Sequence, residues 1–138
     1  MICGIGTDIV DVERILTAYK RHGEKFYKRI LSASEQALME KWPESRQAEF
    51  MAGRFAAKEA IGKACGLGIG LLQMNCVEIA LASQGLSVTF CPQAAGLPHT
   101  QGRWHVSISH TPSVAYAVAV WEDDDANNAG GKDAVAGV

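Results

Sequence analysis

Two carboxylates in the first half of the chain could bind a metal ion together. Asp8 comes at the end of a β-branched segment, residues 2–10, that predicts a strand, and Glu59 lies within a predicted helix. Mg²⁺ commonly takes one or two protein carboxylates and completes its coordination with water and phosphate oxygens. The pair is therefore a candidate Mg²⁺ site. The alternative is that Asp8 caps a helix and Glu59 pairs with Lys63, four residues later.

Three cations lie on the same predicted helix as Glu59. Lys63 is one turn beyond Glu59 and shares its face, whereas Arg54 and Lys58 share a neighbouring face. Such a helix could present a metal ligand together with groups that neutralise phosphate charge, as phosphoryl transfer requires. Any one of these pairs could instead be a simple surface salt bridge.

A second polar cluster stands at the end of a predicted strand, residues 104–110. Ser109, His110 and Thr111 offer hydrogen-bonding groups that could bind a phosphate or an amide. A single histidine at a strand end is more often structural, and the sequence establishes no Ser/His/Asp catalytic order. The GLGIG segment, residues 66–70, is a weak candidate for a phosphate-binding loop because it follows a helix rather than preceding one.

Periodicity and turn residues predict the elements that must position these side chains. The helix that holds Glu59 is the longest, and its apolar residues do not share one face, so we expect neighbours on several sides of it. An N-terminal strand, several helices and then a run of strands predict an α+β fold, with a largely antiparallel sheet packed on the long central helix. The predicted strands are residues 2–10, 76–81, 86–91, 104–110 and 115–121, and the predicted helices are 12–20, 26–31, one that begins at Ser32 or Ser34 and stops at Pro43, and 45–65, capped by Gly66.

Length and composition set the domain organisation. With 138 residues, 48% of them hydrophobic, the chain can form one domain, which we place at residues 1–121. The acidic residues 122–138 lack periodicity and predict a flexible tail. Residues 14–29 hold six basic side chains against one acidic side chain, and this excess suggests either an acidic partner or a solvated helix face.

The apolar runs and the cysteines bear on the location of the protein. The apolar runs are shorter than the ~20 residues that cross a bilayer, and no secretory leader precedes the first predicted strand. The cysteines are too widely spaced for a CxxC motif. We therefore expect a soluble cytoplasmic protein with reduced, mostly buried thiols, and neither a membrane nor a nucleic acid as its partner. The four cysteines are Cys3, Cys65, Cys76 and Cys91.

Three segments carry a resemblance to a known family. They are GIGTDIVDVERI at residues 4–15, GRFAAKEAIGKACGLGIG at 53–70 and HVSISHTPSVAYAVAV at 105–120. In this order and spacing they resemble the holo-acyl-carrier-protein synthases, small members of the 4′-phosphopantetheinyl transferase superfamily. The resemblance covers nearly all of residues 1–121. It implies the fold of that superfamily and the transfer of 4′-phosphopantetheine from coenzyme A to a serine of apo-acyl carrier protein, which releases adenosine 3′,5′-bisphosphate.

The resemblance also implies a role for each candidate residue. Asp8 and Glu59 would hold Mg²⁺ with the diphosphate of coenzyme A, and Lys63 would neutralise charge at the attacked phosphate. Asp8, Glu59 or a water molecule on the metal would accept the proton of the carrier serine. The candidate coenzyme A ligands are Arg54, Lys58, Lys63, Ser109, His110 and Thr111.

Assembly and partners follow from the same resemblance. Small members of the family are homotrimers with active sites between subunits, so His110 could come from the neighbouring chain. Carrier proteins of this system are acidic, which makes the basic residues Arg14, Arg21 and Lys25 the candidate docking surface. The departures from the family's pattern are Leu67, the turn at residues 83–87 and the acidic tail.

Two other functions are compatible with the same residues. One is a catalytically inactive module that binds coenzyme A or a carrier protein, and the other is a different metal-dependent phosphotransferase.

Overall fold

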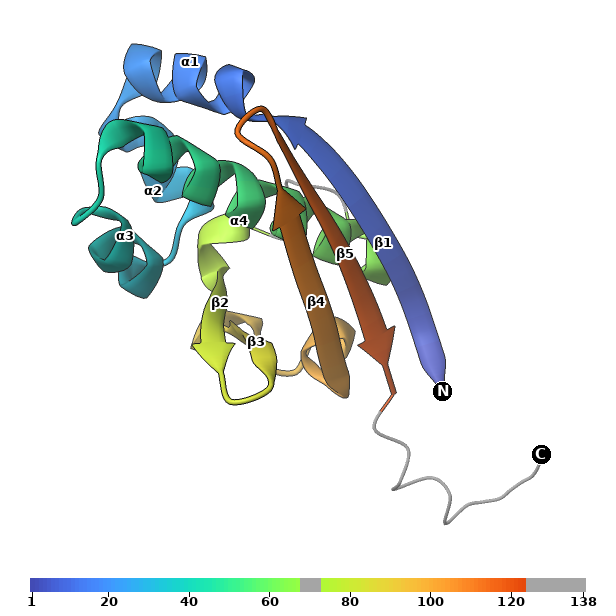
Figure 1. Ribbon diagram of the computed structural model, residues 1–138. Coiled ribbons are helices and arrows are strands. Elements are labelled where there is room, and N and C mark those ends of the chain that lie inside the picture. Colours follow the sequence, from blue (N-terminus) through green and yellow to red (C-terminus); the bar gives the residue numbers. More distant parts are fainter. Residues whose placement is uncertain (68–72, 124–138) are drawn as a thin grey trace, which may run out of the picture.

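A three-stranded antiparallel sheet and one long helix form the centre of the molecule, a computed structural model that describes residues 1–67 and 73–123 (Figure 1). The sheet has the order β1-β5-β4, so the first and last strands of the chain pair with each other. The helix, α4, packs behind the sheet, and the opposite face of the sheet is open. The elements are β1 (Ile2–Asp11), α1 (Val12–His22), α2 (Glu24–Ile30), α3 (Ala33–Met39), α4 (Glu44–Cys65), β2 (Val77–Ala82), β3 (Gly85–Phe90), β4 (Arg103–His110) and β5 (Val114–Glu122).

Small residues allow α4 to lie directly against β1 and β5. A Cβ atom at Gly6 would overlap the carbonyl oxygen of Ala60, and one at Gly4 would overlap that of Ala64. Glycine is therefore required at both positions, because the backbones of strand and helix touch there. On β5 the residues that face α4 are all alanines and are fully buried: Ala115, Ala117 and Ala119.

The helices largely confirm the predicted boundaries. As expected, α4 is buried on several sides, and Gly66 ends it in the left-handed conformation with φ of 77°. Ser32 caps α3 in a capping box with Glu35, which is one of the two predicted starts. Pro43, however, does not stop α3, which ends at Met39; it precedes the first residue of α4, where a proline is tolerated.

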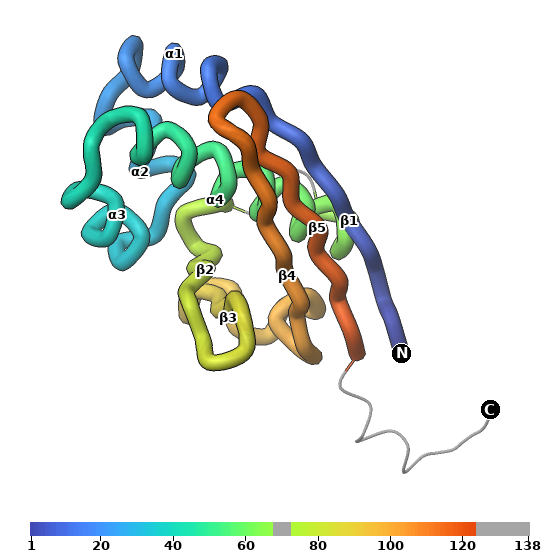
Figure 2. The backbone as a smooth tube through the Cα atoms, viewed as in Figure 1, coloured from blue at the N-terminus to red at the C-terminus, as the bar shows by residue number. Residues whose placement is uncertain are grey.

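The fold class is confirmed, but the antiparallel strands divide into two sheets. β2 and β3 form a separate hairpin, whose two-residue turn, residues 83–84, contains the start of the segment that departs from the family's pattern. Figure 2 shows this hairpin beside β4, with α1, α2 and α3 gathered at the other end of the molecule. β5 extends one residue past the predicted domain boundary, to Glu122. The rest of the predicted tail, from residue 124, and most of the GLGIG segment lie outside the described residues.

The expectation of four reduced, mostly buried cysteines is wrong. Cys76 and Cys91 form a disulfide, with Cα atoms 5.0 Å apart, and Cys3 is exposed. The pairing register explains the bond. Val77 pairs with Phe90, so Cys76, immediately before Val77, lies opposite Cys91, immediately after Phe90. Sequence spacing alone did not reveal this proximity, because it depends on the register of the hairpin.

In the part of the chain that the structure describes, no helix combines the length and apolar character needed to cross a membrane.

Candidate active site

Asp8, Glu59 and Lys63 form one polar group between β1 and α4. Asp8 lies within β1, three residues before its end rather than at the end, and it alternates with Gly6 and Val10 on the face that packs against α4. The Nζ atom of Lys63 lies 3.2 Å from Oδ1 of Asp8 and donates to the carbonyl oxygen of Thr7 at 2.9 Å. The alternative in which Asp8 caps a helix and Lys63 pairs with Glu59 is therefore not what the structure shows.

The electrostatics of Glu59 fit a cation site. Partial burial raises its pKa, the negative charge of Asp8 raises it further, and the nearby Lys63 lowers it. Two carboxylates that repel each other provide the hard oxygen ligands that Mg²⁺ prefers. Within the described ranges no group of three or more His, Cys, Asp or Glu side chains could hold a metal ion. A Mg²⁺ ion here would therefore need water and substrate phosphates to complete its coordination.

A pocket of about 420 Å³ lies on the other side of α4, beside the end of β4, and we call it the α4–β4 pocket. Two arginines lie over aromatic rings there, and a histidine forms part of the wall. The Arg46 guanidinium lies 4.5 Å from the centre of the Trp42 ring, and that of Arg54 lies 4.4 Å from the centre of the Phe50 ring. Nδ1 of His110 lies 3.9 Å from Oε1 of Glu49 at the pocket wall. Cations and aromatic faces together suit an anionic ligand that contains a ring system.

The predicted coenzyme A ligands are not all brought together. Arg54 and His110 share the α4–β4 pocket, whereas Lys63 lies with Asp8. Lys58 is fully buried and donates to Glu35 and to the carbonyl oxygen of Ile30, so its ammonium does not reach a surface of this subunit.

The two neighbours of His110 also differ from it in position. Ser109 faces the open side of the sheet, because successive strand residues alternate between the two faces. The hydroxyl of Thr111 accepts from the backbone N–H groups of Ser113 and Val114, which closes the turn between β4 and β5. The turn thus already uses Thr111, while His110 is half-exposed at the pocket.

The two polar groups lie at opposite edges of the three-stranded sheet. Asp8 is on β1, whereas His110 is on β4, and β5 separates the two strands. Two strand spacings amount to about 10 Å. The helix α4 lies across this gap, with Glu59 and Lys63 on one side and Arg54 on the other.

The predicted docking residues lie on the outer surface of α1 and α2. Arg14 and Arg21 line a groove of about 690 Å³ together with Asp11 and Ser113. This groove begins where β1 ends, so it adjoins the strand that carries Asp8. Lys25 lies in the first turn of α2 and is not part of the groove lining.

Sequence reasoning missed Arg46, Phe50 and Trp42 as parts of a pocket. Arg46, Phe50 and Arg54 recur at four-residue spacing, which places them on one face of α4. That spacing is a usable signal, but aromatic residues at helical spacing more often belong to the core. Glu49 had no recognisable signal, because its neighbour His110 comes from a distant strand.

Comparisons with known proteins confirm the resemblance. The sequence model of the 4′-phosphopantetheinyl transferase superfamily matches residues 4–120. A holo-[acyl-carrier-protein] synthase of Enterococcus faecalis is 41% identical over 124 residues, 90% of this chain and 100% of the relative. That of Bacillus subtilis is 42% identical over 123 residues, 88% of this chain and 97% of the relative.

A solved structure agrees with these relatives in fold. The crystal structure of a holo-(acyl-carrier-protein) synthase from Bacillus anthracis, in complex with CoA (3′,5′-ADP), has a TM-score of 0.77 and 36% identity. It covers 90% of this chain, and this chain covers 99% of it. On the family model, the relatives and the shared fold together, the chain belongs to the 4′-phosphopantetheinyl transferase superfamily.

Proposed function

We propose that this protein is a holo-acyl-carrier-protein synthase that transfers 4′-phosphopantetheine from coenzyme A to a serine of apo-acyl carrier protein. The single observation that carries the proposal is the Asp8, Glu59 and Lys63 group in a chain that aligns over almost its full length with synthases of this name. Two carboxylates and an ammonium at one point provide what displacement at a diphosphate requires.

The chemical step exchanges one phosphorus–oxygen bond for another. The serine oxygen bonds to the phosphorus that carries pantetheine, and the bond from that phosphorus to the oxygen of the second phosphate breaks, which releases adenosine 3′,5′-bisphosphate. The serine proton passes to a carboxylate of the Asp8–Glu59 pair. Lys63 neutralises charge on the transferred phosphate. Asp8 and Glu59 would hold Mg²⁺, which when bound adds further neutralisation of the diphosphate.

The α4–β4 pocket is the proposed site for the adenosine and phosphate end of coenzyme A. Arg54 supplies positive charge, His110 supplies a ring nitrogen for a hydrogen bond, and Phe50 supplies an apolar face. Lys58 and Thr111 are left out, because other groups of the same subunit use their polar atoms. Ser109, on the open face of the sheet, could reach coenzyme A only from a neighbouring subunit.

Separation of the two half-sites supports a homotrimer with active sites between subunits. In a ring of three chains, the β1 edge of one subunit can meet the β4 edge of the next, which unites Asp8 and Glu59 with a neighbour's pocket. The open face of the sheet offers an apolar surface for this contact, since Ile5 and Ile9 are 63% and 68% exposed there.

The basic groove on α1 is the proposed docking surface for the acidic carrier protein. Arg14 and Arg21 lie in the groove, and Lys25 stands on the next helix. An Arg14→Glu/Arg21→Glu variant should raise the KM for the carrier about tenfold or more and leave the KM for coenzyme A unchanged. Lys41→Glu, a charge reversal at an exposed position outside the groove, is the control. An unchanged carrier KM in the double variant would exclude this surface.

The cytoplasmic location stays a prediction. The disulfide between Cys76 and Cys91 counts against it, because such bonds persist mainly in oxidising compartments.

The test of the proposed function is the intact mass of apo-acyl carrier protein after incubation with this protein, coenzyme A and Mg²⁺. We expect a gain of one phosphopantetheine that disappears with EDTA and in Glu59→Ala. The Glu44→Ala variant, whose exposed carboxylate in the first turn of α4 pairs with Lys20, controls for the loss of a helical acid. Binding of coenzyme A without any mass gain, across several carriers, would favour the inactive binding module. Nucleotide turnover without a carrier would favour another phosphotransferase.

A further inference from the structure

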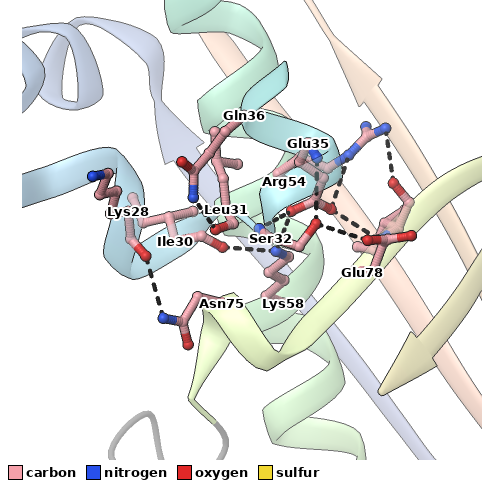
Figure 3. A network of polar contacts seen from close by, with 11 residues as sticks. Lys28, Ile30, Leu31, Ser32, Glu35, Gln36, Arg54, Lys58, Asn75 and Glu78 are labelled. Atoms are coloured by element: carbon pink, nitrogen blue, oxygen red, sulfur yellow. Dashed lines mark hydrogen bonds and ion pairs between the residues drawn. The ribbon is translucent and has the colours of Figure 1, made fainter. Parts of the chain in front are cut away.

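A buried carboxylate joins three elements behind the α4–β4 pocket (Figure 3). Glu35, in the first turn of α3, is only 2% exposed. Its Oε1 atom accepts from the backbone N–H of Ser32 at 2.9 Å and from Nζ of Lys58 at 2.6 Å. Its Oε2 atom accepts from the backbone N–H of Ile79, on β2, at 2.8 Å. These contacts fix the carboxylate relative to α3, α4 and β2.

The fixed carboxylate in turn contacts Arg54, a residue of the pocket wall. Nε of Arg54 lies 3.7 Å from Oε2 of Glu35, and Nη2 donates to the carbonyl oxygen of Ile79 at 3.3 Å. The Phe50 ring covers the guanidinium, so the side chain is only 12% exposed. Among residues 1–67 and 73–123, Nη1 forms no hydrogen bond, which leaves its donors for a ligand in the pocket.

The charges of this cluster leave Arg54 available to an anion. Glu35 has a closer cationic partner in Lys58, at 2.6 Å, than in Arg54, at 3.7 Å. The three side chains together carry one net positive charge when all are ionised. Glu35 therefore directs the guanidinium without neutralising the cluster. An arginine held in place before binding loses less side-chain entropy when a phosphate arrives, which strengthens binding.

We propose that Glu35 is a positioning residue for Arg54 and thereby sets the affinity of the α4–β4 pocket for a phosphate of coenzyme A. The inference rests on the proposed function, in which that pocket binds the adenosine and phosphate end of the substrate. Glu35 itself does not contact the ligand, because it is buried behind Arg54.

The test is the Glu35→Asp variant, which keeps a negative charge opposite Lys58 but shortens the side chain by one methylene. We expect the Kd for adenosine 3′,5′-bisphosphate and the KM for coenzyme A to rise about tenfold, with kcat at saturating coenzyme A within about twofold of wild type. Calorimetry gives the Kd, and the carrier mass assay gives the kinetic constants. An unchanged Kd in the folded variant overturns the positioning role.

Two further variants distinguish a positioning role of Glu35 from general damage to the fold. Ser32→Ala removes a hydroxyl of the same cluster but leaves all three charges and the Glu35 carboxylate beside Arg54, so the Kd should stay within about twofold of wild type. Arg54→Ala should weaken binding, and adding Glu35→Asp to it should weaken binding no further, because the positioned group is gone. Equal effects of Glu35→Asp with and without Arg54 would overturn the proposal.

A folding defect would not leave the question open. If melting curves show that Glu35→Asp is unfolded, the Glu35→Gln/Lys58→Met variant removes both buried charges and should show the same loss of affinity. Wild-type affinity in that variant overturns the proposal. If the wild type transfers phosphopantetheine and the Glu35 variants bind normally, only the positioning role of Glu35 is refuted. If the wild type shows no transfer, the proposed function is refuted instead.

Discussion

The ionised form of Glu59 is unfavourable in the metal-free protein, and a bound cation would make it less so. Burial and the charge of Asp8 both raise its pKa above the ordinary value of 4.5. The folded, metal-free protein then binds more protons than the unfolded chain in the window from 4.5 up through the raised pKa. Stability is therefore lost as the pH rises through this window, and at neutral pH the ionised Glu59 opposes folding. Mg²⁺ binding should offset this opposition.

The Glu59→Gln variant should separate these two effects. Without metal we expect it to melt at the same or a higher temperature than wild type at pH 7, because the repulsion with Asp8 is removed. With Mg²⁺ and coenzyme A the wild type should gain more stability than the variant, which keeps the α4–β4 pocket but lacks one metal ligand, and activity should fall about 100-fold or more. Thermal melts between pH 4 and 8 check this. A large metal-free destabilisation by Glu59→Gln would contradict it.

The proximity of Asp8, Glu59 and Lys63 could be predicted from the sequence, but the partners of Lys58 could not. Asp8, Glu59 and Lys63 stand in short, specific motifs, so their types and their spacing were visible. The burial of Lys58 was not visible, because it depends on Glu35, 23 residues earlier on a different helix. Helical spacing gives the neighbours of a residue on its own helix, whereas partners on other helices and strands require the tertiary fold.

At the level of elements, the contact of β1 with α4 decides where Asp8 stands relative to Glu59. The strand and the helix approach so closely that glycine is the only residue that fits at two positions of β1. Both obstacles are backbone carbonyl oxygens of α4, which cannot move aside as a side chain could. The arrangement of Asp8 and Glu59 therefore depends on two glycines that take no part in the chemistry.

Gly6→Ala should destabilise the protein by about 3 kcal/mol or more, at the upper end of overpacking effects, because the helix must shift. Activity should fall further than stability alone explains, since Asp8 lies next along the same face. Gly66→Ala is the matched control: its backbone is in the left-handed conformation, with φ of 77°, but a Cβ there meets no atom within 4 Å. That variant should cost about 1–2 kcal/mol, the usual penalty for the left-handed region. Denaturant unfolding measures both, and equal costs would refute the close-contact argument.

The β2–β3 hairpin depends on a different restraint. It forms only a two-stranded sheet, and such hairpins are marginal on their own in water. Its disulfide joins residues 15 apart in sequence.

In the chain-entropy model, opening a loop of this size costs about 3 kcal/mol. We therefore expect reduction, or the Cys76→Ser/Cys91→Ser variant, to lower the free energy of unfolding by about this amount. Cys3→Ser, at an exposed free thiol, should change little. Denaturant unfolding with and without reductant measures the difference. Four alkylated thiols in protein trapped directly from cells would show instead that the bond is not formed there.

Most elements could be predicted from the sequence, but the pairing of the first strand with the last could not. Alternation and turn residues located β4 and β5, and helix formers with a final glycine located α4. Neither signal says which strand joins which sheet, because β1 is joined to β5 across the whole domain, while β2 and β3 pair only with each other. The cysteine pair was missed for the same reason, since it follows from the register of that hairpin.

At the level of the whole molecule, each chain carries two separate polar groups. The group of Asp8, Glu59 and Lys63 stands at the β1 edge and the α4–β4 pocket at the β4 edge, with the helix between them. If neighbouring subunits complete each other's sites, a defect on one edge can be corrected by a subunit with a defect on the other edge. A monomer with a complete site allows no such correction.

Mixing of two inactive variants tests this arrangement. Asp8→Ala and His110→Ala, unfolded together and refolded at equal amounts, should regain about one quarter of wild-type activity, because about one site in four receives both intact edges. Mixing without unfolding should restore little if exchange is slow. Light scattering of the refolded sample gives its oligomeric state. Activity no greater than the sum of the two variants would place each whole site within one subunit.

The pairing of β1 with β5 has a consequence for synthesis on the ribosome. Asp11 pairs with Val114 and Ile2 pairs with Glu122, so the first strand has no neighbour in its sheet until nearly the whole domain has been translated. Contacts of such sequence separation slow folding. During that interval the apolar side chains of β1 are uncovered in the nascent chain, where they are prone to aggregation or to capture by a chaperone. A chain truncated before β5 should fail to fold, although it contains Asp8, Glu59 and Lys63.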